Sequence, residues 1–145
     1  MRIIVEGPDN AGKTTLVKFL SSRLGIPIVP GRGPAISQEE INDRVREFHS
    51  IDHGIFDRHP CVSQLIYNQF RKAHNIDQTL VDEFCADERN VFVFCRGRPT
   101  LTGHELNEKD QRVDLDGIKH EDLVKVNHAK ICEAYNKWAL VFAHE

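Results

Sequence analysis

The sequence predicts an α/β fold in three layers, with a five-stranded parallel sheet in the order 2-3-1-4-5 and helices on both of its faces. Two observations lead to this prediction. Short apolar runs alternate along the chain with longer segments of helical periodicity, which is typical of parallel strands joined by crossover helices. The chain of 145 residues also has the length of one ordinary domain, so we expect residues 1–145 to form a single unit.

The first part of the chain predicts two strands around a helix. Residues 3–5 are apolar and precede a glycine-rich turn, and apolar side chains then recur at helical spacing over residues 12–24. Gly25 suits the end of that helix, because glycine readily adopts the left-handed conformation found there. Residues 26–29 form the second expected strand.

The middle of the chain predicts a helix, a strand and a second helix. Ser37 can cap the first of these helices, because its hydroxyl can accept a hydrogen bond from the first turn. Residues 54–57 form the third expected strand. Pro60 suits the first turn of the helix that follows, since the proline nitrogen needs no hydrogen-bond partner there.

The last part of the chain completes the alternation, with helices over 77–87 and 121–137 and strands over 91–95 and 140–143. The run 91–95 is apolar throughout, as in a strand buried on both faces, so we expect the first, third and fourth strands to be central. The segment 96–117 is polar and longer than an ordinary loop. We expect it to be a functional lid or to contain a further helix.

Composition and charge limit the kinds of partner. The net charge of -3 gives no global electrostatic reason to bind nucleic acid. No apolar run approaches the roughly 20 residues of a membrane-spanning helix, and the start of the chain is too short and too quickly acidic for a signal peptide. We therefore expect a cytoplasmic protein, and we leave open whether it forms a homodimer.

A phosphate-binding motif lies between the first expected strand and the first expected helix. The stretch Gly7 to Thr14 reads GPDNAGKT and fits the pattern G-x-x-x-x-G-K-[ST] at every fixed position. Backbone N–H groups of such a loop, together with the helix N-terminus, hold phosphate. Lys13 should reach the β- and γ-phosphates of ATP and Thr14 should bind Mg²⁺. The residues expected to contact the donor nucleotide are Gly7, Asn10, Ala11, Gly12, Lys13, Thr14 and Thr15.

A charged pair follows the third expected strand, at the edge of the sheet where parallel strands gather ligands. Asp57 could bind Mg²⁺, directly or through water, or orient an oxygen of the molecule that receives the phosphoryl group. Arg58 could hold a second phosphate with two hydrogen bonds. The pair therefore adds a candidate acceptor site to the donor site of the loop.

The stretches EGPDNAGKTT (6–15) and DRHP (57–60), with SQLIY (63–67), resemble the thymidylate kinase-like group of P-loop nucleotide kinases, including short members of the phage type. Members carry the pattern E-G-x-D-G-A-G-K-[ST]-T in the loop and D-R-[YH] after the third strand. The resemblance implies that Asp9 contacts the sugar 3′-hydroxyl of the acceptor and that Arg58 positions its phosphate.

The same resemblance implies further arginines. One arginine after the second strand holds the acceptor phosphate in the family, and Arg32 is the candidate here. Lid arginines close over the transferred group, which implies roles for Arg96 and Arg98 and, in the stretch DQRVD, for Arg112.

The helix after Asp57 offers side chains for the pocket of the acceptor base. His59, Ser63 and Tyr67 are one helical turn apart and share a face, and Gln64 is a further candidate. Tyr67 could equally belong to the core. We expect His49, His53 and His120 to be surface residues.

These observations predict an enzyme that transfers the γ-phosphoryl group of ATP, with Mg²⁺, to a small-molecule nucleotide. The preferred acceptor is a deoxynucleoside monophosphate such as dTMP, with Lys13, Asp57, Arg58 and Arg96 as catalytic residues. One alternative is a kinase that acts on a hydroxyl of a deoxynucleoside or a modified base, with Asp57 as general base. Another is a non-catalytic nucleotide-binding module.

Overall fold

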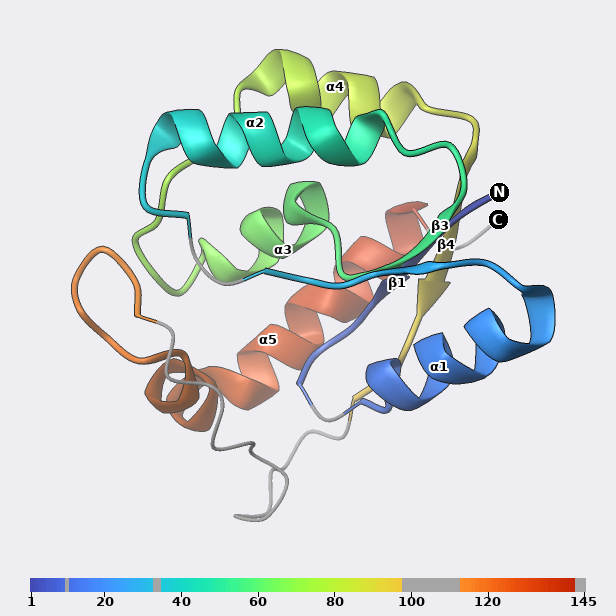
Figure 1. Cartoon of the computed structure of the whole chain (residues 1–145). Helices are drawn as coiled ribbons and strands as arrows, with labels where there is room; N and C mark the ends of the chain where they lie inside the picture. Colours follow the sequence, from blue (N-terminus) through green and yellow to red (C-terminus); the bar gives the residue numbers. More distant parts are fainter. Residues whose placement is uncertain (10, 33–34, 98–112, 143–145) are drawn as a thin grey trace.

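The structure is a computed structural model that describes residues 1–9, 11–32, 35–97 and 113–142. It contains a parallel sheet in the order β2-β3-β1-β4, with helices packed on both faces (Figure 1). The elements in chain order are β1 (Arg2–Glu6), α1 (Lys13–Leu24), β2 (Ile28–Val29), α2 (Gln38–His49), β3 (Gly54–Asp57), α3 (Pro60–Tyr67), α4 (Gln78–Ala86), β4 (Asn90–Phe94) and α5 (His120–Phe142).

The strand register brings the ends of three strands together. Within the sheet, Val5 of β1 pairs with Asp57 of β3, and Glu6 pairs with Phe94 of β4. All three strands run in the same direction, so the segments that follow them leave the same edge of the sheet. That edge therefore carries the glycine-rich loop, the Asp57–Arg58 pair and Cys95.

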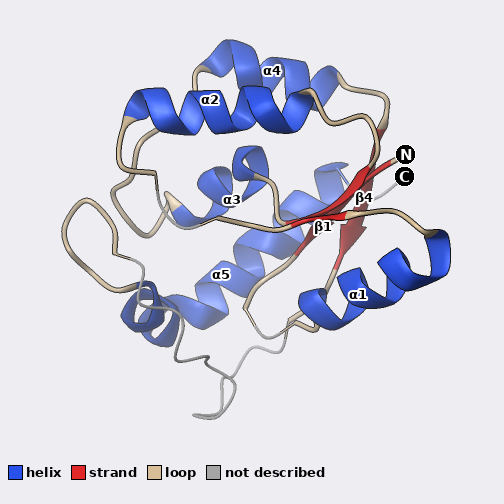
Figure 2. Ribbon diagram, viewed as in Figure 1, coloured by secondary structure: helices blue, strands red, loops and turns tan. Residues whose placement is uncertain are grey.

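The two faces of the sheet are covered unequally (Figure 2). Ile4 and Phe56 point to the face covered by α2, α3, α4 and α5, where the larger cluster of buried side chains lies. Ile3, Val5 and Ile55 point to the other face and pack with Val17 of α1. Helices thus lie on both faces, as the alternation of elements predicts.

Several local predictions about helix ends are confirmed. The Ser37 hydroxyl accepts a hydrogen bond from the Glu40 N–H, which caps α2. Gly25 ends α1 in the left-handed conformation, with φ 67°. Pro60 occupies the first position of α3, which ends at Tyr67.

The predicted fifth strand is wrong. Leu140 and Val141 continue α5, and both are exposed. A short apolar run does not by itself distinguish a strand from a helix, and no glycine or proline follows Lys137 to end the helix. Ala143 lies outside the described residues.

The prediction that the fourth strand is central is wrong as well. Among the described residues β4 is an edge strand of a four-stranded sheet. Its side chains are only partly buried, and Val91 is exposed. Of the predicted lid segment, residues 98–112 lie outside the described part of the chain.

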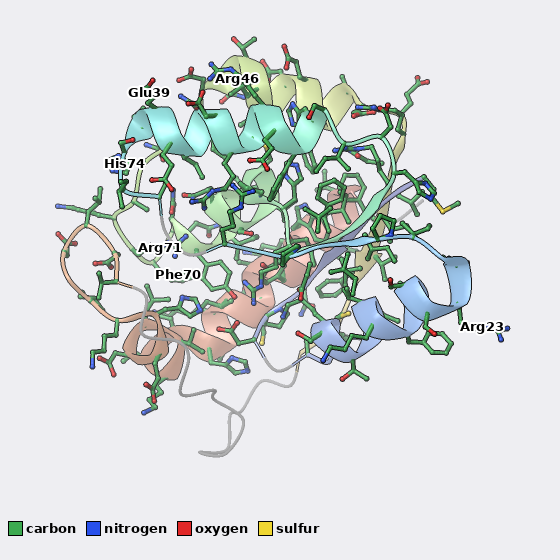
Figure 3. The ribbon with its side chains drawn as sticks, viewed as in Figure 1. Arg23, Glu39, Arg46, Phe70, Arg71 and His74 are labelled. Atoms are coloured by element: carbon green, nitrogen blue, oxygen red, sulfur yellow. The ribbon has the colours of Figure 1, made fainter. Side chains whose placement is uncertain are left out.

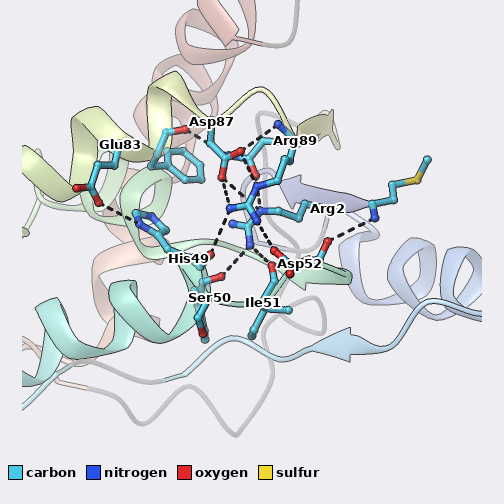
Figure 4. A network of polar contacts seen from close by, with 12 residues as sticks. Arg2, His49, Ser50, Ile51, Asp52, Glu83, Asp87 and Arg89 are labelled. Atoms are coloured by element: carbon cyan, nitrogen blue, oxygen red, sulfur yellow. Dashed lines mark hydrogen bonds and ion pairs between the residues drawn. The ribbon is translucent and has the colours of Figure 1, made fainter.

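A buried arginine ties the N-terminal strand to the end of α2 (Figure 4). Arg2 is fully buried and donates hydrogen bonds to the carbonyl oxygens of Phe48, at 2.8 Å, and Ile51. It also bonds Asn90 Oδ1 at 2.8 Å. Cations are favourable at helix C-termini, where carbonyl groups lack partners. The contact fixes α2 against the sheet, opposite the edge that carries the loop.

Among the described residues, no helix is long and apolar enough to cross a membrane.

Candidate functional site

The loop of residues 7–14, called the phosphate loop below, is shaped by glycine. Gly7 has φ 153°, and a Cβ built on it would lie 2.3 Å from the Cys95 carbonyl oxygen. Gly12, with φ 80°, turns the chain into α1. A side chain at Gly7 would clash with backbone, so the turn requires glycine there. The loop thus ends at the N-terminus of α1, a favourable place for phosphate.

Lys13 folds back over this loop. Its ammonium group is buried and donates a hydrogen bond to the Pro8 carbonyl oxygen. Burial, helped by the nearby Arg58, lowers the pKa of Lys13 to about 8. A bound phosphate would offer the ammonium a negative partner and would favour its charged form.

Two oxygen-bearing side chains meet beside the loop and could hold Mg²⁺. The Thr14 hydroxyl lies 3.5 Å from Asp57 Oδ2, and the contact is exposed. The described residues contain no group of three or more His, Cys, Asp or Glu that could hold a metal. One hydroxyl and one carboxylate still fit Mg²⁺, because that ion is usually bound by one or two protein oxygens plus substrate phosphates and water.

Arg58 is held in an unusual conformation between the loop and α3. Its φ of 70° is the one positive φ among the described non-glycine residues. Its guanidinium lies 2.6 Å from Asp9 Oδ1 and 5.0 Å from the centre of the Tyr67 ring. Strained backbone is frequent at functional sites because the surrounding structure must stabilise it. Here the ion pair and the ring hold Arg58 in place.

Asp9 carries two partners rather than one. His120 Nε2 lies 2.9 Å from Asp9 Oδ2, opposite the contact with Arg58. Although burial by itself raises the pKa of Asp9, Arg58 and the bond with His120 hold it well below its ordinary value. Asp9 is therefore an ionised carboxylate that links the phosphate loop to the beginning of α5.

Glu6 lies at the base of the site. It is fully buried, and its carboxylate accepts hydrogen bonds from the His59 N–H at 2.6 Å and the Tyr135 hydroxyl at 2.9 Å. Burial raises the pKa of Glu6 to about 6, against the opposing effect of Arg58. The glutamate before the loop thus connects β1, α3 and α5.

A cavity opens beside Arg58 between α2 and α3, and we call it the arginine-lined cavity. Arginines from four places in the chain border it, together with apolar and polar groups. Its lining residues are Gly31, Arg32, Ile41, Arg44, Phe48, Arg58, Pro60, Ser63, Gln64, Tyr67, Arg71 and His120. Figure 3 shows Arg71 below α2, whereas Arg46 of α2 points away from the molecule.

The structure brings most of the predicted acceptor residues to this cavity. Arg32, Ser63, Gln64 and Tyr67 all line it. Arg32 also pairs with Glu47 at 2.7 Å. Four of the side chains that were predicted to contact the acceptor thus border one cavity beside Arg58.

His59 lies elsewhere than predicted. Its ring is fully buried against Phe84, with ring centres 4.2 Å apart, and its Nδ1 accepts a hydrogen bond from the Cys61 N–H. His59 caps α3 from inside the core because residues 58 and 59 precede the helix and turn the ring inward. It does not line the cavity.

The structure describes some, but not all, of the residues predicted to contact the donor nucleotide. Ala11, Gly12, Thr14 and Thr15 lie in or beside the loop, and Thr14 and Thr15 are exposed in the first turn of α1. Arg96 is exposed just after β4. Asn10, Arg98 and Arg112 lie outside the described residues.

The sequence-based analysis missed three residues, and the expectation that His120 is a surface residue is wrong. Arg44 and Arg71 line the cavity, and His120 is buried beside Asp9. Arg44 shares helical spacing with the buried Ile41 and Phe48, so its place on the inner face of α2 could have been predicted.

Comparisons with known proteins identify similar folds. Models of protein families give no match to the sequence, and curated proteins give none either. The YorR protein from Bacillus subtilis, solved in complex with phosphorylated GDP, is 23% identical and has a TM-score of 0.66 over 98% of this chain and 81% of that chain.

Deoxyadenosine kinase from M. mycoides is also similar. With bound dATP it is 14% identical, with a TM-score of 0.54 over 95% of this chain and 83% of that one. With dCMP and dCDP bound it is 17% identical, with a TM-score of 0.53 over 100% of this chain and 86% of that one. The parallel sheet, the loop between β1 and α1 and these similarities show that the chain has a P-loop-like α/β fold, shared with this kinase and with YorR.

Proposed function

We propose that the protein transfers the γ-phosphoryl group of ATP to the phosphate of a deoxynucleoside monophosphate, giving a diphosphate. A dTMP-like acceptor agrees with the resemblance of the loop and of DRHP to thymidylate kinases. The similar structures of a deoxynucleoside kinase and of a protein solved with a guanine nucleotide support a nucleotide substrate.

The observation that carries the proposal is the charge of the arginine-lined cavity. Arg32, Arg44, Arg58 and Arg71 all border it. Guanidinium groups match the geometry and charge of phosphate oxygens. Three of these arginines already pair with a carboxylate, Arg32 with Glu47, Arg44 with Glu40 and Arg58 with Asp9. A monophosphate would supply a further anion that the clustered guanidinium groups can bind, which a neutral nucleoside would not.

The donor side follows from the phosphate loop. The N-terminus of α1 and the loop backbone would bind the phosphates of ATP, and Lys13 would leave Pro8 to contact the β- and γ-phosphates. Thr14 and Asp57 would hold Mg²⁺, which neutralises charge on the phosphates when bound.

The transfer itself asks little covalent chemistry of the protein. An oxygen of the acceptor phosphate attacks the γ-phosphorus, and the bond to the bridging oxygen of ADP breaks. The attacking oxygen is already anionic, so no strong base is needed. Lys13 and Arg58 stabilise the charge that spreads over the transferred group.

Labelled ATP and a panel of deoxynucleosides and deoxynucleoside monophosphates would test the proposal. Labelled diphosphates formed from monophosphates are the expected result, and Lys13→Ala should abolish their formation. ATP binding without transfer to any acceptor would contradict an enzymatic role and favour a nucleotide-binding module.

A second candidate function is a kinase acting on a nucleoside hydroxyl. Asp57 at the end of β3 could then serve as general base, and the similarity to deoxyadenosine kinase favours this reading. Labelled monophosphates formed from nucleosides, with none formed from monophosphates, would replace the first proposal by this one.

A further inference from the structure

His120 is a buried histidine with one ring nitrogen in use and one without a partner. Its Nε2 contacts Asp9, whereas its Nδ1 is buried and has no hydrogen-bond partner among the described residues. The residue is 6% exposed and lines the arginine-lined cavity, where its ring lies 5.2 Å from that of Tyr67. Buried polar atoms without a partner are uncommon in native proteins, so this one needs an explanation.

The contact with Asp9 determines what Nδ1 can do. Asp9 is an ionised carboxylate and can only accept hydrogen bonds, so the hydrogen of this contact belongs to Nε2 of His120. In the neutral ring the other nitrogen, Nδ1, is then a hydrogen-bond acceptor. A ligand group that meets the neutral His120 ring in the cavity must therefore donate a hydrogen bond to Nδ1.

The position of His120 indicates which part of the acceptor donates this hydrogen bond. Asp9 belongs to the phosphate loop, and its two carboxylate oxygens are engaged by Arg58 and His120. The reacting phosphate of an acceptor must lie next to this loop, with its sugar adjacent and its base farther away. Gln64, whose Oε1 is also buried without a partner among the described residues, is a separate acceptor group on the same cavity.

We infer that His120 binds the acceptor directly, with Nδ1 receiving a hydrogen bond from a hydroxyl of the deoxyribose, while Asp9 fixes the ring in the required tautomer. This inference rests on the proposed function and gives Asp9 a positioning role. It assigns the hydroxyl contact to a residue at the beginning of α5 rather than to the phosphate loop.

The test compares acceptors with and without the hydroxyl. The best substrate among dTMP, dCMP, dAMP and dGMP is compared with its 2′,3′-dideoxy counterpart, in the natural protein and in His120→Gln. Glutamine keeps an N–H donor for Asp9 but has no acceptor at the position of Nδ1. His53→Gln is the matched control, because His53 is an exposed histidine at the other end of β3.

The natural protein should show a KM about tenfold higher for the dideoxy acceptor, as expected for a buried hydrogen bond that is lost. His120→Gln should raise the KM of the deoxynucleotide to that of its dideoxy counterpart and leave the KM of ATP unchanged. His53→Gln should keep the tenfold ratio. An unchanged ratio in His120→Gln, or an equal rise in KM for both acceptors, would overturn the inference.

Measurements on the natural protein keep the inference testable if His120→Gln does not fold. Calorimetry gives the Kd of both acceptors without turnover, and ¹H–¹⁵N spectra of the histidine rings report on Nδ1. A shift of the His120 Nδ1 signal on binding the deoxynucleotide, but not on binding its dideoxy counterpart, supports the inference. Identical His120 signals with both acceptors overturn it. Absence of transfer to any nucleotide would instead contradict the proposed function, while binding that depends on the hydroxyl would still support the role of His120.

Discussion

Arg44 and Arg46 are two arginines of one helix with opposite surroundings. Arg44 is 8% exposed, pairs with Glu40 and lines the arginine-lined cavity. Arg46 is exposed and pairs with Asp43 on the outer side of α2 (Figure 3). The two therefore form a matched pair for testing whether the cavity receives an anion.

Arg44→Ala should raise the KM of the acceptor monophosphate about 10- to 100-fold, because a charge-assisted hydrogen bond contributes about 1.5–3 kcal/mol. The KM of ATP should not change. Arg46→Ala should leave both values as they are. Steady-state kinetics with each substrate varied in turn would measure this, and equal effects of the two substitutions would speak against the cavity as an anion site.

His59 should make stability depend on pH. Burial lowers the pKa of His59 well below its ordinary value, so the folded protein keeps the ring neutral. Above about pH 6.5 the ring is also neutral in the unfolded chain, and His59 contributes fully. As the pH falls below that value, only the unfolded chain takes up the proton, and stability decreases.

By pH 5.0 this loss should reach about 2 kcal/mol in the free energy of unfolding. His59→Asn keeps a cap for α3 without a titrating group. It should lower stability at pH 7.5, since the ring stacked on Phe84 is lost, but it should show a smaller decrease between pH 7.5 and 5.0. Urea unfolding of both proteins at the two pH values measures the difference, and parallel decreases would contradict the assignment.

Sequence reasoning located these residues unevenly. The spacing of fixed residues identified the phosphate loop. The resemblance pointed to Arg32, and helical spacing after Asp57 pointed to Ser63 and Tyr67, and all three line the cavity. His120 was missed because the helix was expected to begin at residue 121, although His120 lies on the same apolar stripe as Val124 and Ile131. Its contact with Asp9 joins residues 111 positions apart, which no local pattern reveals.

At the scale of elements, helix periodicity and capping residues predicted the helices well, whereas short apolar runs were ambiguous. Leu140 and Val141 read as part of a strand, but the structure places them in α5. In an amphipathic helix the buried side is set by residues three and four apart. Tyr135 and Trp138 occupy that side here, and Leu140 and Val141 face outward.

Substitutions at the end of α5 would separate helix from strand. Leu140→Lys and Val141→Lys should each change the free energy of unfolding by less than about 0.5 kcal/mol, because both side chains are exposed. Trp138→Ala should cost about 3–5 kcal/mol, because it removes a buried ring. Thermal or urea unfolding would measure all three. In a strand, one of the two adjacent residues would be buried, and one lysine would be strongly destabilising.

At the scale of the whole molecule, the sheet edge at the ends of β1, β3 and β4 organises the site. The register of Val5 with Asp57 and of Glu6 with Phe94 is a long-range property that was not predicted, but it was expected that functional side chains gather at the edge where parallel strands end. The number of strands was not predicted correctly, since it depends on how the last apolar run packs. The fold was thus predictable where strands and helices alternate, whereas the last predicted strand was wrong.

The unequal covering of the sheet has a consequence for motion. On the α1 face the buried apolar cluster has six described side chains, against fifteen on the other face. Layers with little buried apolar surface open at lower free energy than the global unfolding transition. Amide hydrogens of α1 should therefore exchange with solvent faster than those of α2 and α5, and ATP should slow them selectively. The donor nucleotide would then stabilise the α1 layer against local opening, and part of its binding free energy would go into ordering that layer.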